Sequence, residues 1–431
     1  MEIKGKIIYE KNEFDFLLKN DNLNISCDYK EAEILTTFKP VRPGVYSLNA
    51  NEKLKENVLS GKTDSGLKIK MKVIWSYYDF IKCEVVCKIH CFVLFNCDEK
   101  TVGLKIKGQD IFNLFNDGEY LTRFIRSAQQ FKYKDESLGK ISFYSKFNRE
   151  KRHLSAFCKV MFEETDDIDN ILSKYYDVRA LFKFIYHRNL LDFSNFILIN
   201  KNSKKTGELF VPGENYTCSK SDLKRAVPFY LIQKTVGKLM TDICHNDIYD
   251  LHFRDSYSSV IKLDVGKLIS LTAGIEHEFG RFKIKIKHDT KKRKQIRFVK
   301  TKYKKILLCK GIRADGRSII KNAIKHLDDV QLETKIVYIL NSIPKYMIEK
   351  FKEWYIVKKE SFSTKTAATD ISKLRNDFAH GETLSSFNQK TVLDLQIIEI
   401  AFAYFQFQKY IKNDIVTTNI VEKLFNVRFG A

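Results

Sequence analysis

The N-terminal part of the chain alternates polar and apolar positions, the pattern of half-buried β-strands. Turn-forming stretches such as NDG and SGKTDSG separate its runs of β-branched and aromatic residues. The clearest runs cover residues 4–10, 22–29, 67–78, 81–95, 102–108, 139–147 and 154–164. Many strands at short intervals predict a β-sandwich or barrel-like domain. Because no glycine-rich loop follows the first run, a dinucleotide-binding unit is not expected here.

The hydrophobic period changes to that of a helix near residue 165. Residues 166–188 place apolar side chains at i, i+3 and i+4 after an acidic first turn, which predicts a helix. The turn-rich stretch 212–222 predicts a boundary between a β-rich domain (1–215, with a helical element near 165–190) and a helical domain (216–431). Further helices are predicted near 222–245, 256–282, 317–328, 331–356, 365–380, 388–412 and 414–426. The expected fold class is α+β multidomain, with a C-terminal helical bundle.

Composition and charge indicate the kind of partner. The 431 residues are 44% hydrophobic and 13% aromatic, enough for globular cores. The formal net charge of +22 favours a polyanionic partner such as RNA; a membrane surface, or lysine accumulated through an AT-rich genome, are the alternatives. The most apolar stretch, 392–411, contains Asp394 and Glu399, so it predicts a buried helix, with no membrane partner.

The 9 cysteines show no disulfide framework. With no signal pattern at the N-terminus, they predict reduced thiols and a cytoplasmic location. Cys83, Cys87 and Cys91, near His90 and Cys97, are separated by even steps, so one strand would place them on one face. Buried thiols are favoured there over metal ligands. No metal and no cofactor is expected.

A basic segment at 281–305 contains Asp289 as its only acidic residue and interleaves aromatic residues such as Phe298 and Tyr303. Such a segment can neutralise phosphates and stack on bases, and a solvated loop or charged hairpin is the alternative. The expected RNA contacts are Lys291, Lys292, Arg293, Lys294 and Arg297.

The stretch LRNDFAHGE, residues 374–382, lies late in a predicted helix that Gly381 would end. Asn376 and His380 are i, i+4 neighbours, whereas Arg375 is about 140° around the helix from His380. Arg375 and His380 can therefore converge only if the arginine bends round the helix or if two copies meet. A dimer fits this geometry better than a monomer.

The residue types in this stretch suit RNA cleavage without a metal. A histidine at a helix C-terminus can donate or accept a proton near neutral pH. Arg375 offers a charged planar fork to a phosphate, and Asn376 can donate to that phosphate or fix the imidazole tautomer. Attack by the ribose 2′-OH would then yield a 2′,3′-cyclic phosphate and a 5′-OH.

These residues resemble the HEPN superfamily, whose mark is an arginine, four residues of which the first is often polar, and a histidine. The resemblance covers roughly 220–431 and implies a helical bundle, a homodimer and a metal-independent endoribonuclease, with Arg375 and His380 as the catalytic pair and Asn376 as the polar position. HEPN proteins often carry another polar residue on an earlier helix, and Glu276 is the best match. It falls on the apolar face of Val265 and Ile269, so it needs a partner, either Arg375, His380 or a local lysine.

The arrangement of a β-rich domain before such a bundle is similar to that of ApeA-type anti-phage abortive-infection proteins. This similarity implies cleavage of host RNA, tRNA above all, and a phage-derived trigger at the N-terminal domain. One alternative is an inactive RNA-binding or scaffold module. Another is a cyclic-oligonucleotide-activated CRISPR ancillary nuclease, which would need a Rossmann-like sensor. His277 between Glu276 and Glu278 resembles a metal cluster, but a core or rim position is favoured.

Overall fold

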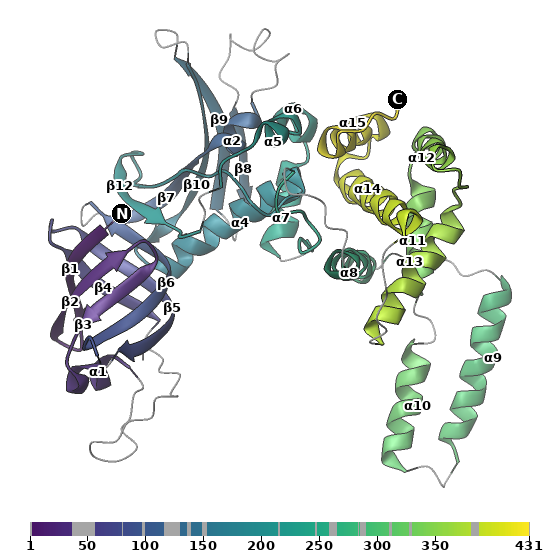
Figure 1. Cartoon of the computed structure of the whole chain (residues 1–431), viewed down its shortest axis with the longest axis horizontal. Coiled ribbons are helices and arrows are strands. Elements are labelled where there is room, and N and C mark those ends of the chain that lie inside the picture. Colours follow the sequence, from purple (N-terminus) through teal and green to yellow (C-terminus); the bar gives the residue numbers. More distant parts are fainter. Residues whose placement is uncertain are drawn as a thin grey trace. The chain divides into compact units, whose positions relative to one another are not determined.

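The computed structural model describes two compact units, which consist of Met1–Asn246 with Phe253–Ser259 and of Asp247–His252 with Val260–Ala431. The first is rich in strands and the second is helical, so the predicted α+β fold class is confirmed (Figure 1). The described residues are 2–36, 57–79, 81–96, 100–115, 130–135, 139–148, 153–213, 216–245, 248–257, 265–282, 284, 290–309, 313–326, 330–380 and 388–430.

Six antiparallel strands of the first unit form a closed, barrel-like ring: β1 (Glu2–Tyr9), β2 (Asn12–Lys19), β3 (Asn22–Ser26), β4 (Val58–Thr63), β5 (Lys68–Asp79) and β6 (Glu84–Phe95). The ring closes because β6 pairs with β5 on one side and with β3 on the other. Alternate residues such as Phe14, Phe16 and Leu18 fill its interior. Helix α1 (Tyr29–Leu35) begins with a capping box of Asp28 and Glu31.

Strand β6 also begins a second part of the sheet, which continues through β12 (Lys205–Phe210), β11 (Asn195–Ile199), β7 (Thr101–Lys107), β10 (His153–Thr165), β9 (Gly139–Asn148) and β8 (Gln130–Asp135). All these pairings are antiparallel. Helix α4 (Ile168–Tyr186), capped by Asp167, packs its apolar face against β5, β7 and β10. The short helix α2 (Gln109–Asn113) follows β7.

The boundary between the units differs from the predicted one. The short helices α5 (Lys220–Lys224), α6 (Phe229–Ile232) and α7 (Val236–Cys244) belong to the β-rich unit, which extends to Asn246 rather than to residue 215. The reason is packing: α7 contacts α4 and β8, and Tyr133 of β8 lies against Gly237. One continuous helix over 222–245 was expected, but Pro228 interrupts it.

The second unit is built around four helices that each contact the other three: α8 (Val265–Arg281), α11 (Leu332–Ser342), α13 (Thr364–Ala379) and α14 (Gln389–Ile411). Their core includes Leu271, Ile339, Ile371 and Phe402. Helices α12 (Lys345–Val357) and α15 (Asp414–Phe425) complete the bundle. A single helix was predicted over 331–356, but Ile343 before Pro344 is extended, with ψ 156°, and ends α11.

Helix α14 is buried along most of its length, as the sequence predicted for residues 392–411. Its acidic residues have polar partners: Glu399 accepts from Lys267 Nζ at 2.8 Å, and Asp394 accepts from the Tyr355 hydroxyl. Within the described residues, no helix has the length and apolar character to cross a membrane.

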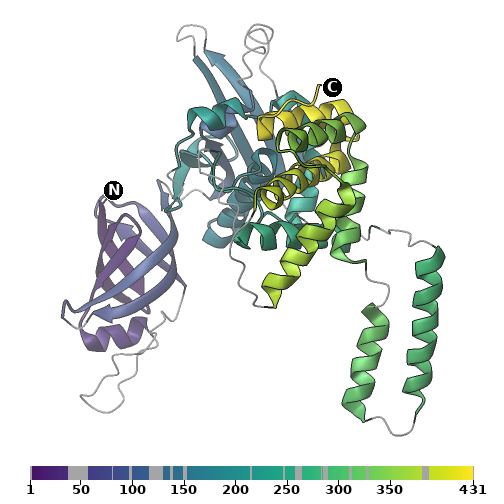
Figure 2. The same cartoon turned by 45° about the vertical axis from the view of Figure 1, so that its right-hand side comes forward.

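The basic segment forms a helix, α9 (Thr290–Leu307), which runs beside α10 (Ala314–His326) in a hairpin (Figures 1 and 2). From the sequence, no helix was expected over 290–307. A half-buried apolar stripe was overlooked there among the lysines. It consists of Ile296, Val299, Tyr303 and Leu307, spaced by three or four residues.

Candidate functional site

Helix α13 positions the predicted catalytic residues. It begins at Ser363, whose Oγ accepts from Thr366 N at 3.4 Å, and it buries Ala367, Ala368 and Ile371 against the bundle. Arg375 follows Ile371 by one turn, so it lies at the edge of this buried face. Its side chain is 36% exposed and extends toward α8.

The structure brings together three of the four predicted catalytic residues. Arg375 Nη2 donates to Glu276 Oε2 on α8 at 3.5 Å, and Arg375 Nη1 donates to Asn376 Oδ1 at 3.3 Å. The sequence left Arg375, His380 or a local lysine as the partner of Glu276, and in the structure the partner is Arg375. Both side chains of this ion pair are more than a third exposed, at 36% and 38%. The pair therefore contributes only about 0–1 kcal/mol to stability.

His380 forms the C-cap of α13. Its backbone N–H donates to Asn376 O at 3.0 Å and to Asp377 O at 3.2 Å, which places it one turn beyond Asn376. Its side chain is exposed, and no hydrogen bond or ion pair to the imidazole is seen in the described part of the chain. The structure therefore does not join His380 to Arg375 through a direct contact. Gly381, expected to end the helix, lies outside the described residues.

The face of α8 that bears Glu276 was expected to be apolar and buried, but it is partly exposed to solvent. Ile269 on this face is 48% exposed, and the core face is instead formed by residues such as Leu268, Leu271 and Ile275. The buried acid of this helix is Glu278, which is 1% exposed. It accepts from Gln406 Nε2 at 3.1 Å and pairs with Lys409 Nζ at 3.2 Å on α14.

Glu276, His277 and Glu278, which resemble a metal cluster in the sequence although a core or rim position was favoured, have different neighbours in the structure. His277 lies beside the ring of Tyr249, with centroids 5.6 Å apart, while Glu276 and Glu278 have the partners given above. In the part of the chain that the structure describes, no three His, Cys, Asp or Glu side chains are grouped to hold a metal ion.

Burial on one strand face was predicted for Cys83, Cys87 and Cys91, and it is confirmed for the last two only. Cys87 and Cys91 are buried on β6, and burial raises the pKa of each thiol to about 12. Cys83 precedes the strand and is exposed, because Asp79 Oδ1 accepts from Ile81 N and Lys82 N and so fixes a turn there. Cys97 lies outside the described residues.

The expected RNA contacts lie on α9. Lys294 and Arg297 are exposed, whereas the side chains of Lys291, Lys292 and Arg293 lie outside the described set. Residues 290–307 contain no acidic side chain. Phe298 is 63% exposed beside Lys302, whose Nζ lies 5.3 Å from the centre of its ring. Helix α9 thus presents positive charge together with an aromatic face, as nucleic-acid-binding surfaces do.

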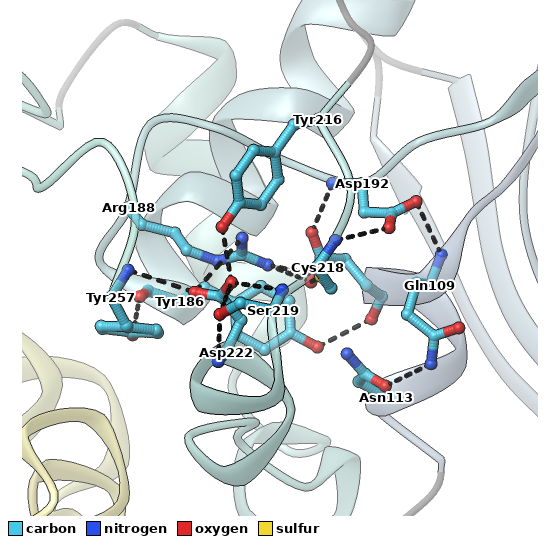
Figure 3. A network of polar contacts seen from close by, with 11 residues as sticks. Gln109, Asn113, Tyr186, Arg188, Asp192, Tyr216, Cys218, Ser219, Asp222 and Tyr257 are labelled. Carbon is cyan, nitrogen blue, oxygen red and sulfur yellow. Dashed lines mark hydrogen bonds and ion pairs between the residues drawn. The ribbon is translucent and has the colours of Figure 1, made fainter. Parts of the chain in front are cut away.

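A buried polar cluster in the first unit was not predicted. Arg188 (Figure 3) is 1% exposed and forms ion pairs with Asp110 and Asp222. Its guanidinium lies 5.3 Å from the ring of Tyr216 and 6.0 Å from that of Tyr257. Burial raises the pKa of the Asp110 carboxyl although Arg188 opposes the shift. The arginine and the two aspartates are far apart in the sequence, so no local pattern indicated that they meet.

Comparison of the chain with protein-family models, with curated proteins and with solved structures finds no significant match. The function proposed below therefore depends on the chemistry of this chain's own residues.

Proposed function

We propose that the helical unit is a dimeric endoribonuclease that cleaves RNA without a metal ion. The observation that carries this proposal is the half-exposed Arg375, which is held by its long ion pair with Glu276. This arginine lies on the last turns of the helix that ends at the exposed His380. A guanidinium and an imidazole near each other supply charge stabilisation and proton transfer, which are the two requirements of 2′-OH attack.

In the absence of RNA, the Glu276 carboxylate occupies the position beside Arg375 that a phosphate of the substrate takes when RNA binds. Its ion pair with Arg375 is worth about 0–1 kcal/mol because both side chains are solvated. A charge-assisted, bidentate bond to phosphate is worth about 1.5–3 kcal/mol. An RNA phosphate therefore displaces the Glu276 carboxylate, which holds the guanidinium extended until RNA binds.

Histidine accepts the proton that leaves the 2′-oxygen and donates the proton that reaches the 5′-oxygen, so no other acid or base is needed. The 2′-oxygen forms a bond to phosphorus while its proton passes to a neutral imidazole. The bond from phosphorus to the 5′-oxygen breaks, and an imidazolium protonates that oxygen. The products are a 2′,3′-cyclic phosphate and a 5′-OH. Two copies of α13 across a two-fold axis supply both His380 rings, and Asn376 and Arg375 stabilise the charge on the phosphorane.

The RNA is held by α9, whose Lys294 and Arg297 are exposed and face no acid on their own helix. The resemblance to HEPN proteins favours tRNA as the target, a cytoplasmic location and a role in anti-phage defence, with the β-rich unit responding to a phage-derived trigger. The Rossmann-like sensor required by the CRISPR alternative has parallel strands, whereas the strand ladders β1 to β12 of the described residues are antiparallel.

The test is cleavage of total tRNA in EDTA by the full chain and by His380→Ala. We expect wild type to give 2′,3′-cyclic phosphate ends, and the variant to lose cleavage while retaining helical content and oligomeric state. The matched control is His245→Ala, because His245 is also an exposed histidine at a helix C-cap. Equal cleavage by wild type and His380→Ala would refute the proposal, as would products ending in a 3′-OH.

A second candidate is an RNA-binding module that does not cleave. The basic, acid-free helix α9 favours it, since binding needs α9 alone. It predicts salt-sensitive RNA binding by both wild type and His380→Ala with no products from either.

A further inference from the structure

The β-rich unit contains a cavity of about 630 Å³ that no part of the proposed nuclease uses. It is lined by Phe92 of β6, by residues 192–197 before and in β11, by residues 208–213 and 216–217 in and after β12, and by the turn between β2 and β3. Ligand pockets for small organic molecules have volumes of about 300–1,000 Å³, so this cavity has the size of a binding site.

The charge of the cavity is opposite to that of the chain. Among the described residues, its lining includes the acidic residues Asp21, Asp192 and Glu208 and no lysine, arginine or histidine, although the chain carries a formal charge of +22. Asp21 and Glu208 each pair with a lysine, Lys88 and Lys205. Asp192 instead accepts from two backbone groups, Cys218 N at 2.9 Å and Gln109 N at 3.4 Å, with no cation partner among the described residues.

Aromatic residues belong to the remaining lining. Among them Phe210 is half-buried, whereas Phe92, Phe193 and Phe196 are 1%, 2% and 8% exposed. Phe92 and Phe210 both line the cavity and stack with their ring centroids 4.6 Å apart. Phe193 and Phe196 also line it and meet edge to face. Aromatic rings attract cations electrostatically and also bury aliphatic groups. A lining of carboxylates and aromatic rings is therefore suited to a positively charged organic group.

The walls of the cavity are held in place by the buried Arg188 cluster. The backbone N–H of Asp192 donates to Asp110 Oδ2 at 2.7 Å, and the Tyr216 hydroxyl donates to Asp222 Oδ2 at 2.5 Å (Figure 3). Both aspartates pair with Arg188. The anchoring carboxylate and one aromatic wall are thus fixed before any ligand arrives, which lowers the entropy cost of binding.

We propose that this cavity binds an organic cation, an ammonium or guanidinium group on an aliphatic chain, with Asp192 as its counter-charge. The half-buried ring of Phe210 covers the aliphatic part of the ligand. The group can belong to a free amine or to a lysine or arginine side chain of another protein, since both present the same chemistry. The site is independent of RNA cleavage.

The experiment measures binding to the full-length protein by calorimetry. The probes are spermidine, agmatine and a short arginine-containing peptide, with ATP as the anionic comparison. We expect saturable binding of at least one cationic probe, and Asp192→Asn should weaken it at least tenfold, about 1.4 kcal/mol. Asp15→Asn, an exposed aspartate on β2, is the matched control and should leave the affinity unchanged. The free amines and the peptide, compared with each other, distinguish the two sources.

Hydrogen exchange of the wild-type protein tests the proposal even if Asp192→Asn does not fold. The cationic probe should slow exchange in peptides covering residues 192–197 and 208–213, and Phe210→Ala should reduce that protection. ATP should not protect these peptides. The proposal is overturned if no cationic probe binds at concentrations up to about 10 mM. It is also overturned if a folded Asp192→Asn binds as tightly as wild type, or if protection lies outside the cavity.

Discussion

Two glutamates on α8, two residues apart, should differ greatly in their effect on stability. Glu278 is 1% exposed and binds Lys409 and Gln406, whereas the Glu276 side chain is 38% exposed and binds Arg375. Truncation of Glu278 to alanine removes the carboxylate that pairs with Lys409, whose side chain is 18% exposed. It also removes the acceptor of the hydrogen bond from Gln406 Nε2.

The size of each effect follows from solvent exposure. Breaking a buried ion pair by removing one partner costs about 3–5 kcal/mol, because the remaining charge loses a counter-charge in a poorly solvated place. Removing one partner of an exposed pair costs about 0–1 kcal/mol. With a urea m-value of about 2 kcal/mol/M, Glu278→Ala should lower the unfolding midpoint by roughly 1.5–2.5 M and Glu276→Ala by less than about 0.5 M.

The assay must report on the helical unit alone, and the chain permits this. It contains 2 tryptophans, of which Trp75 lies in the β-rich unit and Trp354 in the helical unit. In a Trp75→Phe background, fluorescence follows Trp354, which packs against Phe351 with centroids 5.2 Å apart. Equal midpoint shifts in the two variants, or a shift below about 0.5 M for Glu278→Ala, would show that the burial argument is wrong.

Three further predictions concern charge, thiols and pH. Replacing Lys294 and Arg297 on α9 by alanine should reduce the slope of log K against log salt for single-stranded RNA by about 1.4, measured by fluorescence anisotropy; an unchanged slope contradicts contact through α9. Iodoacetamide should modify the exposed Cys83 and Cys309 well before the buried Cys158, whose thiol pKa is raised by burial, and mass spectrometry of timed samples would reveal the opposite order. Burial raises the pKa of Asp394 above its ordinary 3.8, so the resulting stabilisation is complete below pH 3.8 and is lost as pH rises through the folded-state pKa. Asp394→Asn should therefore gain stability relative to wild type as pH rises from about 4 to about 7, and a constant difference would contradict this.

Regular patterns in the sequence predicted the elements that depend on local burial. Strand β5 was expected at 67–78 and lies at Lys68–Asp79, and α14 was expected at 388–412 and lies at Gln389–Ile411. Strand β5 largely alternates buried and more exposed positions, whereas α14 is recognised by its long apolar run, because it is buried on nearly all sides. Helix α9 was not predicted, because its basic residues outnumber the half-buried apolar residues that pack in the hairpin and therefore obscure the helical period.

Features made by distant residues were beyond prediction from local patterns. Closure of the ring depends on β3 pairing with β6, and nothing in either strand specifies that partner. The Arg188 cluster joins residues from 110 to 257 in the same way. For the candidate site, an acid on α8 was expected to need a partner, but its identity followed only from the packing of α8 beside α13. The catalytic role of that site stays a prediction.

The path of the chain between its two units limits how this protein can be divided or recombined. Residues 247–252 belong to the helical unit, yet Phe253–Ser259 belong to the β-rich unit, where Tyr257 N donates to Asp222 and its hydroxyl to Tyr186 O. A single break at Asn246 would thus take Tyr257 away from its partners. A gene fusion that replaces one unit at a single position would therefore separate residues of the β-rich unit from each other. We expect the coding regions of the two units to be inherited together.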